Sequence, residues 1–376
     1  MSGVRHLYVH LPFCAHRCGY CDFVTVVGRR GQHRAYVDAL LAELELQRRV
    51  LEPRLETVFL GGGTPTFTEP AELERLLAAL PCADEVTVEA NPETVTRELA
   101  ALLRRQGVNR VSLGAQSFQP RLLDVLDRVA GPDDVRRAVY HLRDAGFDNI
   151  SLDLIYGIPG QEPADLEADI AEALTLRPEH LSCYELEAKP GTRFTHAHGD
   201  ELRRQAEAME DYFERIVEAV VGAGYRWYET ANFCLAPGEA AGHDLRARHN
   251  LAYWHGRDYL GLGIGAVSTV RGERRRTTPR LAGYIAALRD GRLPPCDVEL
   301  LPETVQRDER VLLGLRLDEP LPLEPVASAL DREALARLER LGLALRVPAG
   351  RGRSAALTLT PRGRFLGDAV TADLLA

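Results

Sequence analysis

The stretch Cys14-Ala-His-Arg-Cys18-Gly-Tyr-Cys21 places three cysteines close together near the start of a 376-residue chain. A cluster of four irons is ordinarily held by four cysteine thiolates, and no fourth cysteine stands near this C-x3-C-x2-C run. The spacing therefore indicates a 4Fe-4S cluster with one iron left for an outside ligand. In radical chemistry that ligand is S-adenosylmethionine.

Two other uses of clustered cysteines fit the sequence less well. A structural zinc site prefers four ligands in two pairs, whereas His16 lies inside the cluster rather than at a finger-like distance. A disulfide framework suits neither the odd number of seven cysteines nor an N-terminus without a signal-peptide core. We expect the remaining four to be ordinary buried thiols: Cys82, Cys183, Cys234 and Cys296.

Length and charge narrow the class of protein. A chain of 376 residues exceeds what one core usually sustains, so a large domain with a smaller appendage is expected. The net charge of -9 argues against nucleic-acid binding, which would need a basic face. No apolar run is long enough to span a bilayer, so we expect a cytoplasmic protein without a transmembrane segment.

Short β-rich runs alternate with helical segments from residue 4 to about 230. The expected strands are 7–10, 57–60, 85–89, 110–114, 150–156 and 180–186. The expected helices include 35–49, 70–80, 98–105, 133–144 and 166–174. Six βα units predict an α/β fold whose parallel sheet curls into a partial (β/α)6, TIM-like barrel.

A second unit is predicted after the turn-rich stretch 291–296. Helical segments at 303–313 and 333–341, strands at 343–347 and 356–359, and a helix after Pro361 are typical of a small winged-helix-like α+β domain. No basic recognition helix stands out, so a packing or partner role is favoured over DNA binding. The predicted domains are 1–235 for the barrel, 236–295 for an extension and 296–376 for the C-terminal unit.

Glycine and polar residues gather at the ends of the expected strands, where parallel barrels assemble their active sites. Gly61-Gly62-Gly63-Thr64 would let a ligand lie against backbone amides, and Glu89 could accept a ribose hydroxyl. An amide, a guanidinium and a carboxylate could grip a charged ligand: Gln116, Arg128 and Asp153. Each of them could equally be a structural residue of the rim, and Tyr8 could be a core residue.

The segment His249-Asn250-Leu-Ala-Tyr253-Trp254 allows two interpretations. Histidine is a common axial ligand of heme iron, and aromatic rings can pack on a porphyrin. Spacing alone equally allows a core histidine beside packed aromatic residues.

Taken together, these motifs resemble the radical S-adenosylmethionine (SAM) proteins related to the oxygen-independent coproporphyrinogen III dehydrogenase. Within that family the chain is most similar to the heme chaperones. The resemblance covers nearly the whole length. It is carried by the stretches at 8–14, 14–21, 61–66, 112–118, 153–159 and 249–254.

The resemblance implies a role for each matching residue. Cys14, Cys18 and Cys21 would bind the cluster, and Tyr8, Gly62 and Glu89 would contact a first SAM. A second SAM site would correspond to Tyr20, Gly63, Thr64, Gln116, Arg128 and Asp153. The H-N-x-x-Y-W motif of the chaperones implies heme association at His249, Tyr253 and Trp254.

Two positions depart from the dehydrogenase pattern. Phe23 stands where the dehydrogenase has a fourth motif cysteine, and Val129-Ala130 stand where the family often has a histidine after the arginine. The second departure puts the second SAM site in doubt.

The resemblance therefore implies a heme chaperone that binds a 4Fe-4S cluster, SAM and heme. It would deliver heme to apo-hemoproteins such as respiratory-chain components, with homodimer formation and peripheral membrane contact left open. The alternative is an oxygen-independent coproporphyrinogen III oxidase, a radical enzyme of porphyrin biosynthesis. A zinc-stabilised regulatory protein is a third, weaker alternative.

Overall fold

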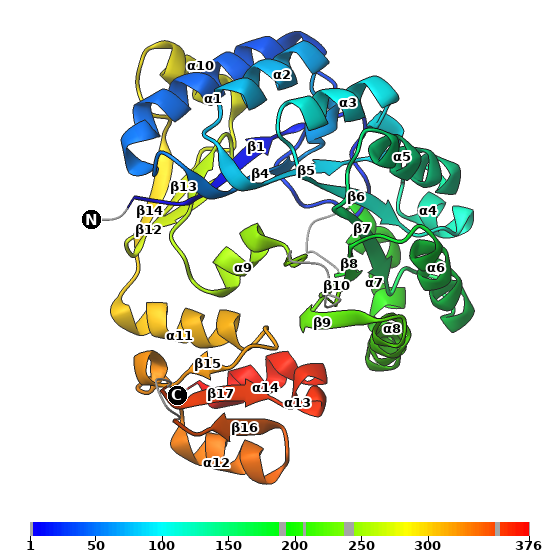
Figure 1. The fold of residues 1–376 in the computed structure, drawn as a ribbon, viewed down its shortest axis with the longest axis vertical. Coiled ribbons are helices and arrows are strands. Elements are labelled where there is room, and N and C mark those ends of the chain that lie inside the picture. Colours follow the sequence, from blue (N-terminus) through cyan, green and yellow to red (C-terminus); the bar gives the residue numbers. More distant parts are fainter. Residues whose placement is uncertain (1–2, 188–192, 206–207, 237–243, 350–353, 376) are drawn as a thin grey trace.

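The computed structural model describes residues 3–187, 193–205, 208–236, 244–349 and 354–375. A large hydrophobic cluster joins buried residues from Val4 to Leu288, and a separate one joins residues from Val311 to Leu374. Figure 1 shows the two parts as an upper α/β body and a smaller lower unit.

A nine-stranded sheet forms the centre of the large body, in the order β11-β1-β4-β5-β6-β7-β8-β10-β9. Its six predicted strands are β1 (His6–Leu11), β4 (Leu55–Gly62), β5 (Ala83–Ala90), β6 (Arg110–Gln116), β7 (Ile150–Tyr156) and β8 (His180–Glu185). All six run parallel, which confirms the predicted sheet. Because β11 and β9 stand at opposite ends of the order, the sheet is a partial barrel.

Three further strands extend the sheet at its ends. At one end β11 (Leu260–Leu262) pairs in parallel with β1. At the other, β10 (Asn232–Leu235) and β9 (Tyr225–Glu229) add an antiparallel hairpin beside β8.

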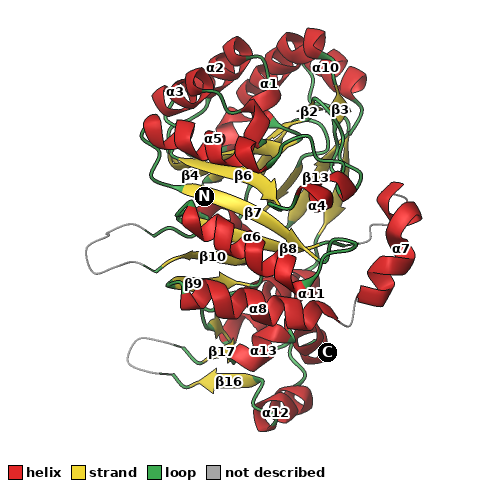
Figure 2. Cartoon of the chain, turned by 90° about the vertical axis from the view of Figure 1, so that its right-hand side faces the viewer, coloured by secondary structure: helices red, strands yellow, loops and turns green. Residues whose placement is uncertain are grey.

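Helices cover the outer face of the sheet, and Figure 2 shows α5, α6 and α8 lying over the strands. The helices of this layer are α1 (His33–Gln47), α2 (Pro70–Ala79), α3 (Arg97–Arg105), α4 (Pro120–Val125), α5 (Pro132–Asp144), α6 (Pro163–Thr175) and α8 (Met209–Gly222). Helix α7 (Arg193–Gln205) stands apart from this layer in Figure 2. Several begin with proline, whose missing N–H is harmless in a first turn.

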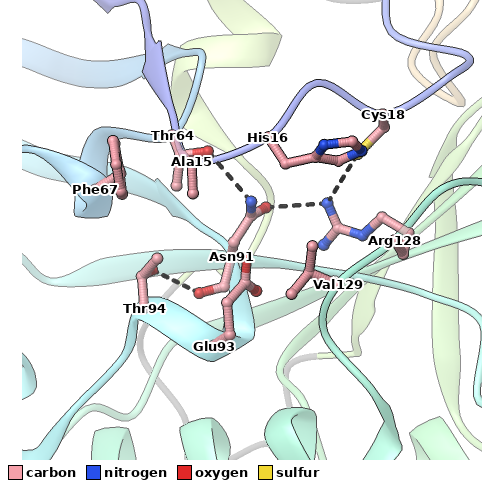
Figure 3. Close-up of a pocket in the computed structure, with 10 residues that line it drawn as sticks. All are labelled: Ala15, His16, Cys18, Thr64, Phe67, Asn91, Glu93, Thr94, Arg128 and Val129. Atoms are coloured by element: carbon pink, nitrogen blue, oxygen red, sulfur yellow. Dashed lines mark hydrogen bonds between the residues drawn. The ribbon is translucent and has the colours of Figure 1, made fainter. Parts of the chain in front are cut away.

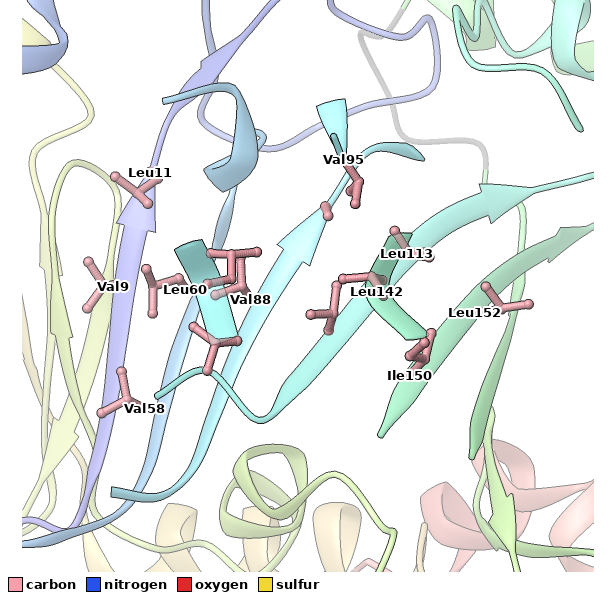
Figure 4. Packing of buried hydrophobic residues seen from close by; sticks show 14 of the residues in the cluster. Val9, Leu11, Val58, Leu60, Val88, Val95, Leu113, Leu142, Ile150 and Leu152 are labelled. Carbon is pink, nitrogen blue, oxygen red and sulfur yellow. The ribbon is translucent and has the colours of Figure 1, made fainter. Parts of the chain in front are cut away.

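The strands are apolar along most of their length because both faces of a parallel sheet are covered. Figure 4 shows Val9, Leu11, Leu60 and Val88 packed together between neighbouring strands. This packing holds the strand ends in a fixed arrangement.

Short elements complete the large body. The pair β2 (Phe13–Cys14) and β3 (Val26–Val27) closes the base of the cysteine loop. Helix α9 (Arg248–Trp254) packs against β4, and α10 (Leu281–Arg289) packs against α1. A three-stranded antiparallel sheet consists of β12 (Val267–Val270), β13 (Glu273–Thr277) and β14 (Cys296–Leu300).

The small unit has the predicted order of helices and hairpin. It contains α11 (Glu303–Gly314), β15 (Leu321–Pro322), α12 (Arg332–Arg340), β16 (Ala344–Val347), β17 (Ala356–Leu359), α13 (Pro361–Phe365) and α14 (Gly367–Leu374). The predicted boundary at residue 296 falls at the start of β14, which pairs with β13 of the large body. Residues 296–300 are thus tied to the extension rather than to the C-terminal cluster.

The four remaining cysteines follow the prediction only in part. Cys183 and Cys234 are buried in the sheet, as expected. Cys82 and Cys296 are exposed, so the prediction of a buried thiol was wrong for these two. Cys82 lies directly before β5, and Cys296 is the first residue of β14.

Candidate functional site

The carboxyl ends of the parallel strands border one open cavity of about 1620 Å³. The structure brings most of the predicted site residues to its wall: Cys14, Cys18, Tyr20, Cys21, Gly62, Gly63, Thr64, Glu89, Gln116, Arg128 and Asp153. We call this space the cluster cavity. Tyr8 lines an adjacent cavity of about 690 Å³, which shares Gly62, Glu89 and Asp153 with the first.

The three cysteines lie on one loop at the mouth of the cluster cavity. Cys14 ends β2, and the amide of Cys21 donates a hydrogen bond of 3.2 Å to the carbonyl of Cys18. Burial raises the pKa of the Cys14 thiol to about 11, and burial also raises the pKa of Cys21. Binding of iron would therefore displace protons from this loop.

Within the described ranges, no three His, Cys, Asp or Glu side chains come together as ligands of a single metal ion. In a 4Fe-4S cluster each cysteine binds a different iron, so this observation does not bear on cluster binding. The chemistry of the loop fits a cluster, because three thiols from one short segment face a cavity lined by hydrogen-bond donors.

A chain of polar contacts connects the cysteines to the strand ends. Arg128 Nη1 lies 3.6 Å from Cys18 Sγ and donates to Asn91 Oδ1 at 3.2 Å (Figure 3). Asn91 Nδ2 donates to Thr64 Oγ1 at 3.2 Å, and Thr64 Oγ1 donates to Cys14 Sγ at 3.5 Å. Two of the three sulfur atoms thus lie near a donor: Thr64 follows β4, and Arg128 lies between α4 and α5.

The glycine triplet makes room for neighbouring groups. A Cβ at Gly61 would lie 2.8 Å from Glu89 Oε2, and a Cβ at Gly63 would lie 2.5 Å from the carbonyl of Pro12. Gly62 has a φ of +109°, which side chains rarely tolerate. Its amide donates to Glu89 Oε2 at 3.1 Å. The triplet therefore positions Glu89 as well as exposing backbone.

Glu89 and Asp153 form an acidic pair at the wall of the cavity, and each side chain is half-buried. Burial and the nearby Asp153 raise the pKa of Glu89 to about 7. Burial raises the pKa of Asp153 too, although the Ser112 hydroxyl lies 3.1 and 3.2 Å from its two oxygens. Carboxylates with this little solvent around them favour a cationic ligand or hydroxyl donors. An amine, a sulfonium and a ribose provide these groups, so the pair fits SAM.

Gln116 and Arg128 approach each other across Gly114. Gln116 ends β6 with a φ of +64°, where the register of the strand shifts. Arg128 Nη2 donates to the carbonyl of Gly114 at 2.7 Å, while its buried Nε finds no acceptor among the described residues. Val129, which stands where the family often has histidine, is 68% exposed.

Sequence reasoning gave no role to two residues that hold this site together. Asn91 links Arg128 to Thr64, and its place directly after a strand was the available signal. Asp169 of α6 accepts hydrogen bonds from Ser117 Oγ at 2.6 Å and the amide of Phe118 at 2.7 Å. Asp169 thereby fixes the turn after Gln116, and nothing in a helical pattern distinguishes it.

The residues of the H-N-x-x-Y-W motif do not share one site. His249 is buried, with Nδ1 2.7 Å from Thr57 Oγ1 and Nε2 2.8 Å from Tyr253 Oη. Burial lowers the pKa of His249 to about 3, so its ring is neutral. Both ring nitrogens are engaged, and this arrangement leaves neither of them for iron.

Tyr253 lines the same small cavity as His249 and Tyr8, whereas Trp254 lines a different cavity beside the C-terminal unit. The structure thus divides the three residues between two cavities, and their association with heme stays a prediction. Adjacent positions of a helix point about 100° apart, which separates Trp254 from the other two.

Comparison with known proteins places this geometry in a family. The profile of the radical SAM superfamily matches residues 8–173. Over 98% of its length, the chain is 36% identical to the heme chaperone HemW of Mycobacterium tuberculosis, of which it covers 94%. The chain belongs to the HemW family. It is also 34% identical to HemW of Bacillus subtilis, with 83% of each chain covered.

Among solved structures, the chain resembles the coproporphyrinogen III oxidase HemN of Escherichia coli, which is described as a radical SAM enzyme. The TM-score is 0.81 at 22% identity, over 99% of this chain and 90% of that one. At this identity the likeness shows that this chain shares the fold of that protein. In the described part of the chain, no helix has the length and apolar character to cross a membrane.

Proposed function

We propose that this protein is a heme chaperone that binds a 4Fe-4S cluster and SAM, takes up heme and delivers it to apo-hemoproteins. Respiratory-chain components are the expected acceptors. The observation that carries the proposal is the 36% identity to a heme chaperone over 98% of the chain. The assembly of the predicted cluster and SAM residues around one cavity supports it.

In this proposal Cys14, Cys18 and Cys21 hold the cluster, which supplies an electron to a bound ligand when it is reduced. Arg128 and Thr64 keep donors directed at the sulfur atoms. Their contacts stabilise thiolate charge, which buried cysteines otherwise resist.

In this proposal the acidic pair of Glu89 and Asp153 selects the ligand. Glu89 and Asp153 attract a cationic group into the cavity and accept hydroxyl donors. The backbone of Gly62 fixes one oxygen of Glu89 and leaves the other for the ligand.

Heme transfer provides the test. Anaerobically reconstituted protein is loaded with heme and mixed with an apo-b-type cytochrome, and the absorption spectrum follows the transfer. We expect faster transfer than from free heme. A variant with Cys14, Cys18 and Cys21 changed to serine should lose both the brown colour of an iron-sulfur cluster and the faster heme transfer. Cys82→Ser, an exposed cysteine outside the cavity, is the matched control. A wild-type rate equal to that of free heme would contradict the proposal.

One observation keeps the enzyme alternative open. The residues that correspond to a second SAM site line the same cavity as the cysteines. Incubation with coproporphyrinogen III, SAM and a reductant decides between the two functions. Formation of protoporphyrinogen would overturn the chaperone assignment.

A further inference from the structure

A second cavity lies where the large body meets the C-terminal unit. Its volume is about 740 Å³, and it shares no residue with the cluster cavity. In Figure 1, α9 lies between the sheet and α11, and the cavity is lined from these helices and from α13 and α14. We call it the junction cavity. Nothing in the proposed cluster or SAM chemistry uses it.

Two buried donors in the junction cavity have no acceptor. The indole Nε1 of Trp254 and Nη2 of Arg364 both lack a hydrogen-bond partner in the described part of the chain. Buried polar groups are normally paired, and an unpaired buried donor destabilises the fold. An acceptor of a bound ligand that reaches either donor would remove that cost.

The cavity also carries positive charge that no described carboxylate pairs with. Arg364 Nη1 donates to the carbonyl of Trp227 at 2.9 Å, and its guanidinium stacks 3.6 Å from the centre of that indole ring. By contrast, Arg316 Nε donates to the buried carboxylate of Glu229 at 2.7 Å. Glu229 therefore neutralises Arg316. Among the described residues, no carboxylate forms an ion pair with Arg364, although the charges of Asp318 and Glu229 act on it. The exposed Asp368 also lines the cavity and is its acidic member.

The rest of the wall is largely apolar, with Thr230 and Thr371 as its uncharged polar members. Leu312, Leu313 and Leu315 line it together with the indole of Trp254, over which Arg316 stacks at 4.7 Å. A ligand that suits this wall has an apolar body and at least one carboxylate. Neither a bare anion nor a purely apolar molecule would satisfy both parts.

We infer that the junction cavity binds the carboxylate of an apolar ligand, with Arg364 and the indole N–H of Trp254 as its donors. Only the identity of the ligand rests on the proposed function. Under that function the ligand is heme, held by one of its propionates. It assigns to Trp254 the heme contact that the geometry of His249 does not support.

The test compares heme with its dimethyl ester, in which both propionates are blocked, by titration of the full-length protein. The wild type should prefer the free acid. Arg364→Gln should reduce that preference about 10- to 100-fold, the effect of one hydrogen bond to a charged group. Trp254→Phe keeps a ring and removes the N–H, and should reduce it about fivefold to tenfold.

Arg362→Gln is the matched control, because Arg362 is an exposed arginine of the same helix and does not line the cavity. It should keep the wild-type preference. If Arg364→Gln does not fold, Trp254→Phe alone decides. An unchanged preference in the folded variants would overturn the inference.

A second probe separates this inference from the proposed function. If the wild type binds neither form of heme, the chaperone proposal fails, and pyrenebutyrate and its methyl ester replace the two hemes. Fluorescence polarisation should then show binding of the free acid that Arg364→Gln weakens. No binding, or equal binding by wild type and variant, would overturn the carboxylate site itself.

Discussion

At the scale of the residue, Gly61 shows how a missing side chain can position a reactive group. The space that a Cβ would take is filled by Glu89 Oε2 and the ring of Phe59, each 2.8 Å away. Any larger residue must displace one of them. The glycine thus acts on the ligand through its neighbour, without contacting the ligand itself.

Gly61→Ala should therefore weaken SAM binding about 10-fold or more, because Glu89 would lose its position at the cavity wall. Calorimetric titration of the reconstituted protein measures the effect. Gly283→Ala is the control, since a Cβ there meets nothing within 4 Å, and it should bind SAM normally. Wild-type affinity in Gly61→Ala would show that the position of Glu89 is not needed.

His249 has a structural explanation at the same scale. Its ring stacks on Phe59 at 5.1 Å and joins Thr57 to Tyr253 by hydrogen bonds at its two nitrogens. Removing the ring leaves a cavity, and the hydroxyl groups of Thr57 and Tyr253 lose their hydrogen bonds to it.

We expect His249→Ala to lower the free energy of unfolding by about 2 to 4 kcal/mol. Urea denaturation checks this value. The absorption spectrum of bound ferric heme should not change, because hydrogen bonds to Thr57 and Tyr253 occupy both ring nitrogens. A stable variant with an altered heme spectrum would restore His249 as an axial ligand.

At the scale of the element, Glu43 joins three parts of the barrel wall. It lies on α1, accepts from Tyr284 Oη of α10 at 2.6 Å, and accepts from the amide of Gly263 after β11 at 2.9 Å. Burial raises the pKa of this carboxyl to about 7, even though both hydrogen bonds oppose the shift.

This carboxyl makes stability depend on pH with a definite sign. The unfolded chain releases the proton near pH 4.5, whereas folded Glu43 holds it to about 7. The unfolded state binds fewer protons in this window, so stability falls as the pH rises through it. Between pH 5 and pH 8 the wild type should lose about 2 to 3 kcal/mol more than Glu43→Gln. Urea unfolding at both pH values measures this difference. Glu45→Gln, an exposed position of the same helix, should behave like the wild type.

The parallel strands were predictable because each is an apolar run that ends in glycine or a polar residue, as at Gly62 and Gln116. The end strands were not. The three residues of β11 carry no period, and they pair with β1 from about 250 positions away in the chain. Long-range pairing of this kind leaves no local signal.

For the site, too, features with a local sequence signal could be predicted and long-range contacts could not. Residues at strand ends could be assigned to one rim, since parallel strands end together. The partner of His249 could not be found, because Thr57 lies 192 positions away. Helical spacing does indicate that Trp254 is separate from His249 and Tyr253. Those two residues, four positions apart, lie on one face of the helix, and Trp254 lies on another.

At the scale of the whole molecule, a few polar contacts connect the two parts. Glu229 of β9 is fully buried and accepts from Arg316 Nε at 2.7 Å and Asn232 Nδ2 at 2.6 Å. Arg226 and Asp318 form a two-bond ion pair nearby, at 2.7 and 2.9 Å, but both side chains are partly exposed.

Burial decides which of these contacts matters for stability. Glu229→Gln should lower the free energy of unfolding by about 3 kcal/mol, because it leaves the charge of Arg316 without its buried partner. Asp318→Asn should lower it by less than about 1 kcal/mol. Urea denaturation of both variants tests the ranking, and a larger loss in Asp318→Asn would contradict it.

The two exposed thiols, Cys82 and Cys296, lie on the large body and away from the cluster loop. A maleimide dye added to native protein would mark both of them first, whatever the state of the iron. Each further dye molecule bound per chain would then report one cysteine of the cluster loop that has not bound iron. The two exposed thiols thus provide an internal standard for measuring the fraction of molecules that have bound iron.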